Sequence, residues 1–221
     1  LQVNVHYDGR FATLSLPEAE RIIHLRHLIR TYLSTMEEIG VDTWLMHGSL
    51  LGWYWNQRIM PWDTDIDVQV SEPGIRYLAH YYNMTVHHFP DIDIDGKKYL
   101  LEINPHYANA SHLDTHNLID ARWIDTSTGL FIDITALRRD YTSTTISSSS
   151  PSSVENMLTT KARHTYLSTS IYPLRRTTFE SAPAKIPYSY VEILRGEYGD
   201  RALTRTRFLG HRFDGERKEW V

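Results

Sequence analysis

The stretch His47-Gly48-Ser49, followed by Asp63-Thr64-Asp65-Ile66-Asp67-Val68, says most about the fold and chemistry of this chain. The two segments border predicted strands at residues 41–46 and 66–70, where β-prone apolar residues are concentrated. Side chains alternate along a strand, so Asp65 and Asp67 share one face, with Cα atoms about 7 Å apart, while Ile66 faces the core. Both carboxylates can therefore reach a single hard cation.

A third acid, Asp133, lies in a similar apolar setting within Phe131-Ile132-Asp133-Ile134 and completes the predicted cluster. Neighbouring carboxylates repel each other, and a divalent cation supplies the charge that keeps them ionised. Mg²⁺ favours one or two carboxylates together with phosphate and water, which suits Asp65 and Asp67. Any one of these acids alone would be interpreted as a helix cap or a solvated charge at a strand end. Their joint pattern favours a site for Mg²⁺ or Mn²⁺.

Residues beside these acids are suited to holding a phosphate group. Gly48 lacks a Cβ atom, so its backbone can approach a phosphate closely, and Ser49 offers a hydroxyl and, where a helix begins, an amide. Asp63 is either a third metal ligand or a residue that supports the ligands. The basic segment around His164 either contacts nucleotide phosphates or forms a solvated face.

Composition narrows the possible classes of protein. The 221 residues include 23 Lys and Arg against 27 Asp and Glu, a net charge of −4, so the basic surface of a general nucleic-acid binder is not expected. The absence of Cys excludes disulfides, Cys-ligated zinc and thiol catalysis. No run of about 18 apolar residues occurs, so no membrane span is expected within this chain.

Hydrophobic spacing predicts a single α/β domain over residues 1–221. The apolar pattern predicts helices at 17–38, 71–82 and 188–198, further strands at 118–124 and 130–135, and a hairpin at 91–102 around Asp95-Gly96. Residues 142–153 are almost entirely Ser and Thr, which predicts a flexible insertion because such a segment buries little apolar surface.

The motifs at 47–52 and 59–67 resemble the signature of the LicD/fukutin-type family of the nucleotidyltransferase fold. The fungal Mnn4-like branch, associated with mannosylphosphate transfer, is the most similar. Further segments that echo this branch lie at 104–106, 119–125, 129–135, 172–175, 210–211 and 219–220. One departure is Thr64, a position where bacterial members usually carry another Asp.

The resemblance implies a polymerase β-like core, a small mixed sheet flanked by helices. It also implies a metal-dependent phosphotransferase that moves a phospho-sugar or phospho-alcohol, mannose phosphate in the fungal branch, onto a glycan hydroxyl. The donor would be GDP-mannose or a CDP-alcohol. Asp65 and Asp67 would hold the metal, Asp133 would be a shared ligand or the base, and Gly48, Ser49, Asp63 and His164 would bind nucleotide or phosphate. Two alternatives stay open: an ordinary nucleotidyltransferase that releases pyrophosphate, and a non-catalytic partner of a glycosyltransferase complex.

Location follows from the resemblance as well. Fungal members are usually membrane-tethered, which implies the secretory pathway, with the Golgi lumen as the expected compartment and the tether outside this sequence. Extracellular or cytoplasmic placement stays open.

Two other patterns suggest metals and have simpler interpretations. Asp91 to Glu102 fits the letters of an EF-hand loop, but no amphipathic helix flanks it, and an Asp-Gly hairpin explains the same residues. Histidines such as His87 and His88 invite a zinc interpretation, but no Cys or HExxH motif accompanies them, so surface or hydrogen-bonded histidines are expected.

Overall fold

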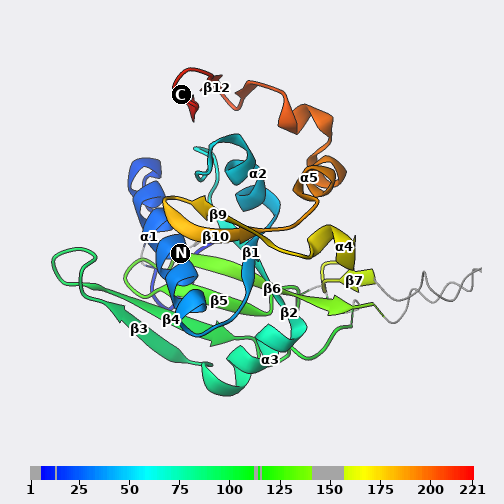
Figure 1. The fold of residues 1–221 in the computed structure, drawn as a ribbon. Helices are drawn as coiled ribbons and strands as arrows, with labels where there is room; N and C mark the ends of the chain where they lie inside the picture. Colours follow the sequence, from blue (N-terminus) through cyan, green and yellow to red (C-terminus); the bar gives the residue numbers. More distant parts are fainter. Residues whose placement is uncertain (1–5, 13, 112–113, 115, 141–156) are drawn as a thin grey trace, which may run out of the picture.

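A mixed sheet forms the centre of the computed structural model, which describes residues 6–12, 14–111, 114, 116–140 and 157–221 (Figure 1). The strand order is β1 (Thr43–Leu45), β2 (Ile66–Ser71), β6 (Phe131–Arg139), β5 (Ala121–Asp125), β4 (Lys97–Ile103) and β3 (Thr85–Phe89). β7 (Met157–Thr159) pairs with β6 and β8 (Thr165–Leu167) pairs with β7. Only the β2–β6 pair among these described strands is parallel. The predicted mixed sheet is confirmed, whereas the Ser/Thr-rich stretch 142–153 lies outside the described residues.

The two faces of the sheet have opposite chemical character. Ile66, Trp123 and Ile132 occupy paired positions on one face and are fully buried. Helix α1 (Glu18–Glu38) covers this face, and the Trp123 indole N–H donates to the Thr31 hydroxyl at 3.2 Å. Asp67 and Asp133 occupy paired positions one residue further along, so alternation places them on the opposite face. The apolar face therefore fixes which way the acids point.

The remaining elements surround this sheet. They are the helices α2 (His47–Asn56), α3 (Glu72–Tyr81), α4 (Ser168–Ile171) and α5 (Tyr190–Tyr198), the 3₁₀ turn η1 (Asp200–Leu203), the hairpin β9 (Arg175–Phe179) and β10 (Ala182–Ile186), and a small sheet of β11 (Arg207–Phe208), β12 (His211–Asp214) and β13 (Glu219–Trp220). In Figure 1, α2, α5 and the C-terminal strands gather at one end of the molecule, above β9 and β10. No helix in the described part of the chain has both the length and the apolarity that crossing a membrane requires.

The structure differs from the prediction at the hairpin and after β1. The first strand of the hairpin lies at β3 rather than at residues 91–95, because Phe89 pairs with Lys97 and the segment between them forms the turn. Gly96 in that turn has φ +71°, and a Cβ there would lie 2.7 Å from His88 Nε2. The EF-hand pattern is consequently flanked by strands, and Glu102 pairs with Arg10. The second difference is α2, which follows β1 directly and was not predicted as a helix.

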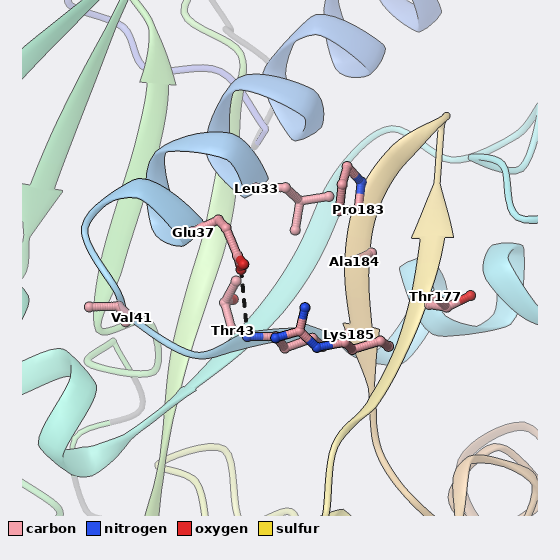
Figure 2. A pocket seen from close by; sticks show the side chains of 9 residues that line it. Leu33, Glu37, Val41, Thr43, Thr177, Pro183, Ala184 and Lys185 are labelled. Carbon is pink, nitrogen blue, oxygen red and sulfur yellow. Dashed lines mark ion pairs between the residues drawn. The ribbon is translucent and has the colours of Figure 1, made fainter.

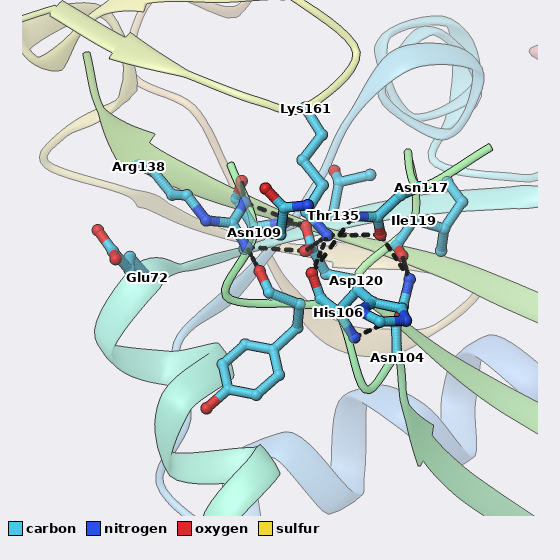
Figure 3. Close-up of polar contacts among 12 residues, drawn as sticks. Glu72, Asn104, His106, Asn109, Asn117, Ile119, Asp120, Thr135, Arg138 and Lys161 are labelled. Carbon is cyan, nitrogen blue, oxygen red and sulfur yellow. Dashed lines mark hydrogen bonds and ion pairs between the residues drawn. The ribbon is translucent and has the colours of Figure 1, made fainter. Parts of the chain in front are cut away.

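A buried ionic network holds the loop before β5 against the end of β6 (Figure 3). Asp120 is fully buried and accepts bonds from the Arg138 guanidinium at 2.7 Å and the Lys161 ammonium at 2.9 Å. Lys161 also donates to the Asn117 side chain, and Arg138 donates to the Tyr107 carbonyl. The network therefore adds side-chain bonds between three chain segments that adjoin the β5–β6 and β6–β7 ladders.

A small cavity of about 60 Å³ lies between α1 and β10, lined in part by Leu33, Pro183 and Ala184 (Figure 2). The Lys185 ammonium at its edge lies 3.7 Å from the Glu37 carboxylate. Pockets for small-molecule ligands occupy roughly 300–1,000 Å³, so this cavity is a packing gap.

Candidate active site

A cavity of about 540 Å³ opens where β2 begins, and it has acidic, basic and aromatic walls. Asp63, Asp65 and Asp67 line it together with Gly48, which brings together four residues that the sequence singled out. Arg201 and Arg205 line it from the segment around η1, and Trp62, Phe208 and Trp220 supply aromatic surface. The volume falls in the range of sites for nucleotide-sized ligands.

Asp133 lies beside this group through the parallel pairing of β2 with β6. Asp67 is directly opposite Asp133 in the register, so both side chains project from the same face on adjacent strands. The Arg122 guanidinium, from β5, donates to Asp133 Oδ1 at 3.2 Å. Asp133 is not among the residues that line the cavity, so it adjoins the acidic wall from the sheet side.

Ser49 holds Asp67 in place. Its side chain is buried, and its Oγ accepts a hydrogen bond from the Asp67 backbone N–H at 3.0 Å. The Asp67 carbonyl in turn accepts from the Met46 N–H at 3.2 Å. These bonds join the start of α2 to the start of β2, so the Ser49 hydroxyl fixes the position of the acidic strand, and its contact with phosphate stays a prediction.

The first turn of α2 faces the acids. The helix begins at His47, which adopts a positive φ of 50°, and no side chain caps its first-turn amides. A Cβ on Gly48 would lie 3.9 Å from Asp63 Oδ2, so this backbone and the Asp63 carboxylate are close neighbours. Free amides and the positive end of the helix dipole attract anions, which makes this turn suitable for a phosphate.

Burial and mutual repulsion disfavour the ionised forms of these acids. Burial, followed by repulsion from Asp65, raises the pKa of Asp63 to about 7. The same two causes raise the pKa of Asp67 to about 7, against the opposing effect of His47. Burial also raises the pKa of Asp133 in spite of Arg122. A divalent cation such as Mg²⁺ or Mn²⁺ beside such a cluster of carboxylates would favour their ionised form.

His164 does not line this cavity, so the structure does not bring it together with the acids. It lines a separate surface hollow with Tyr166 and Glu197, and its ring centroid is 4.7 Å from that of His47. The sequence placed it near the phosphates because of neighbouring basic residues. Packing instead brings it beside His47, in that separate hollow.

The sequence interpretation missed the basic and aromatic wall that the last quarter of the chain provides. Its arginines, including Arg201 and Arg205, lie close together in a chain of net negative charge, which was an available signal. The aromatic packing that positions this wall, Trp62 on Phe208 at 5.1 Å and on Trp220 at 4.9 Å, joins residues about 150 positions apart. No local pattern encodes that contact.

The raised pKa of Asp63 predicts a pH-dependent effect of Asp63→Asn on stability without metal. A carboxyl group whose pKa is higher in the folded state than the ordinary value near 3.9 contributes stability at low pH and loses it as the pH rises through about 7. The variant lacks this loss. We expect the free energy of unfolding of the variant, relative to that of the parent, to increase between pH 4 and pH 7 and to level off above pH 8. Urea unfolding in the presence of a chelator measures this difference. Asp91→Asn, at an exposed turn, should show no such trend, and an offset of Asp63→Asn that is constant with pH would contradict the assignment.

Comparison with known proteins identifies the family of this chain. Residues 40–189 match the family described as LicD/FKTN/FKRP, nucleotidyltransferase domain. Two relatives from Saccharomyces cerevisiae, Mannosyltransferase regulator 4 and Mannosyltransferase regulator 14, are each 34% identical to this chain over 135 and 136 residues. The matched segment covers 60% of this chain but only 11% and 14% of those relatives. The matched family segment includes Gly48, Ser49 and the four acids. This chain therefore belongs to the LicD/FKTN/FKRP nucleotidyltransferase-domain family.

Proposed function

We propose that the chain binds a nucleotide diphospho donor through a divalent cation and transfers its phospho-sugar or phospho-alcohol group to a glycan hydroxyl. The observation that carries this proposal is that one cavity combines an acidic wall, two arginines and aromatic surface. The acids, on a polymerase β-like core, fit Mg²⁺ or Mn²⁺. The mannosyltransferase regulators among its relatives favour mannose phosphate, with GDP-mannose as donor ahead of a CDP-alcohol.

Different residues of the chain would bind the cation and the phosphate groups in such a transfer. Asp65 and Asp67 would hold the cation, with Asp63 beside them. The cation would neutralise charge that develops on the diphosphate. Arg201, Arg205 and the α2 amides would bind the phosphate oxygens.

The chemical step conserves atoms and charge. The acceptor oxygen forms a bond to the phosphorus that carries the sugar or alcohol, and the bond from that phosphorus to the nucleoside monophosphate breaks. The acceptor hydroxyl gives its proton to a carboxylate, for which Asp133 is the candidate because its pKa is raised by burial. Asp133 would otherwise complete the ligand set.

A second candidate function follows from the printed names of the relatives, which are regulators. In that case the chain binds the donor as a non-catalytic partner of a glycosyltransferase complex. For either role we propose that the protein works in the secretory pathway, with the Golgi lumen as its compartment.

Product analysis separates the possibilities. The chain would be incubated with Mn²⁺, a mannan acceptor and GDP-mannose, CDP-choline or CDP-ribitol, and the nucleotide products would be separated by chromatography. Nucleoside monophosphate that forms only with acceptor supports the proposal. Pyrophosphate would indicate ordinary nucleotidyl transfer. Donor binding without any product would support the regulator.

The basic wall predicts that Arg205→Gln weakens donor binding. A hydrogen bond to a charged group contributes roughly 1.5–3 kcal/mol, so the Kd should rise about tenfold or more. Titration calorimetry with GDP-mannose and Mn²⁺ measures this change. Arg207→Gln is the matched control, because Arg207 is also exposed, two residues further on, but does not line the cavity. Equal loss in both variants would indicate a general charge effect and contradict a specific contact.

A further inference from the structure

Three potential metal ligands, none of which lines the donor cavity, converge beside the start of α2. His47, His164 and Glu197 each offer one ligand atom, and these atoms all lie within 4.8 Å of one another. His47 Nδ1 and Glu197 Oε2 are 3.0 Å apart. The three residues come from the start of α2, the turn before β8 and the last turn of α5, so tertiary packing alone brings them together.

The carboxylate in this group is already oriented. The Tyr166 hydroxyl donates to Glu197 Oε1 at 2.8 Å, which leaves Oε2 directed at His47. Outer hydrogen bonds of this kind fix the position of metal ligands. The Tyr166 ring also lies parallel to that of His164, at an interplanar angle of 9°.

An ion can reach this position from solvent. His164, Tyr166 and Glu197 line a surface hollow of about 400 Å³. His47 and Glu197 are both largely enclosed, with 18% and 14% of their side chains exposed, so the open side of the site lies at His164.

We propose that His47, His164 and Glu197 bind one Zn²⁺ ion, at a site separate from the carboxylates of the donor cavity. Two imidazoles and one carboxylate match zinc, whereas Mg²⁺ favours oxygen ligands alone. Ligand atoms of a tetrahedral zinc ion lie roughly 3.3 Å apart, given Zn–N and Zn–O distances near 2.1 Å. Because no separation exceeds 4.8 Å, closing the widest one takes a movement of at most about 1.5 Å, which a side-chain rotation of the partly exposed His164 supplies. Three protein ligands leave a fourth position for water.

The position of this site suggests what the ion does. It would tie the start of α2 to the end of α5 and to the β7–β8 hairpin. Both helices border the donor cavity, through Gly48 and Tyr198 respectively. The zinc ion would therefore stabilise the walls of that cavity without contacting the donor.

Zinc binding can be measured without any activity assay. The metal-free chain would be titrated with ZnCl₂ in competition with a chromophoric chelator. We expect one equivalent to bind with a Kd in the micromolar range or below. Loss of an outer hydrogen-bonding partner weakens metal sites about 10- to 100-fold, so Tyr166→Phe should cost about tenfold, and His164→Ala or Glu197→Gln at least about 100-fold.

Two control variants define where the ion binds. His80→Ala removes an exposed histidine on α3, and Asp65→Asn alters the donor cavity; both should retain zinc affinity within about twofold. Circular dichroism of each metal-free variant checks that the fold is intact. Co²⁺ should also give visible absorption bands in the parent that His164→Ala lacks. Unchanged zinc affinity in His164→Ala and Glu197→Gln, loss of the zinc equivalent in Asp65→Asn, or no zinc binding by the parent would overturn the proposal.

Discussion

Replacing Asp67 by asparagine is expected to lower the rate of acceptor-dependent transfer on the order of 10³-fold, or about 4 kcal/mol in activation free energy. Asp67 lines the donor cavity and lies opposite Asp133 in the β2–β6 register. The substitution keeps the shape of the side chain and the bond from the residue 67 amide to Ser49, but it removes one negative charge from the cation site. The rate of nucleoside monophosphate release at saturating donor and Mn²⁺ measures the effect.

Asp91→Asn makes the same chemical change at an exposed turn and should keep the parental rate. Removing the repelled carboxylate should also leave the metal-free fold of Asp67→Asn at least as stable as the parent, since burial and Asp65 raise the pKa of Asp67. Lost activity would then reflect the site and not unfolding. If Asp67→Asn kept more than about a tenth of the parental rate, Asp67 would not be a ligand of the catalytic cation.

Asp120→Asn is expected to cost about 3–5 kcal/mol of folding free energy, which is typical of removing one partner from a buried ion pair. Its carboxylate receives bonds from Arg138 and Lys161, and a third, at 2.8 Å, from the Ala136 backbone N–H. All three side chains are buried, so neither cation can recover its solvation when the charge at position 120 is lost. Urea unfolding followed by circular dichroism measures the loss.

The surface substitution Asp91→Asn again serves as the reference, with an expected change within about 0.5 kcal/mol. A loss below about 1 kcal/mol in Asp120→Asn would show that Arg138 and Lys161 find other partners or water. Because the network lies at the end of β6 away from Asp133, a variant that still folds at low temperature should keep its donor affinity.

Local patterns in the sequence predicted the parts of the structure that depend on local rules. The apolar spacing at 17–38 corresponds to α1, which buries residues such as Leu25, Leu28 and Tyr32. Strand alternation placed Asp65 and Asp67 on one side, and both line the donor cavity. These features need only the helical and strand periods to be recognised.

The parts that were missed depend on distant contacts. The sequence predicted that Asp133 joins the acidic cluster but not the register that sets it opposite Asp67, which joins strands more than 60 residues apart. α2 begins at a histidine with positive φ directly after a strand, a junction with no start signal in the sequence. β11 and β13 have two residues each, too few for any alternation to appear. His164 could not be placed because its neighbours, His47 and Glu197, come from separate elements.

The most direct test of the central claim is donor binding that depends on the cation. GDP-mannose, CDP-choline and CDP-ribitol would each be titrated into the metal-free chain by calorimetry, with and without Mn²⁺, for the parent, Asp65→Asn and Asp91→Asn. We predict that Mn²⁺ strengthens binding of at least one donor about tenfold or more in the parent and in Asp91→Asn, and that Asp65→Asn lacks this gain. Binding that is indifferent to Mn²⁺, or that gains equally in Asp65→Asn, would contradict a cation site at these carboxylates.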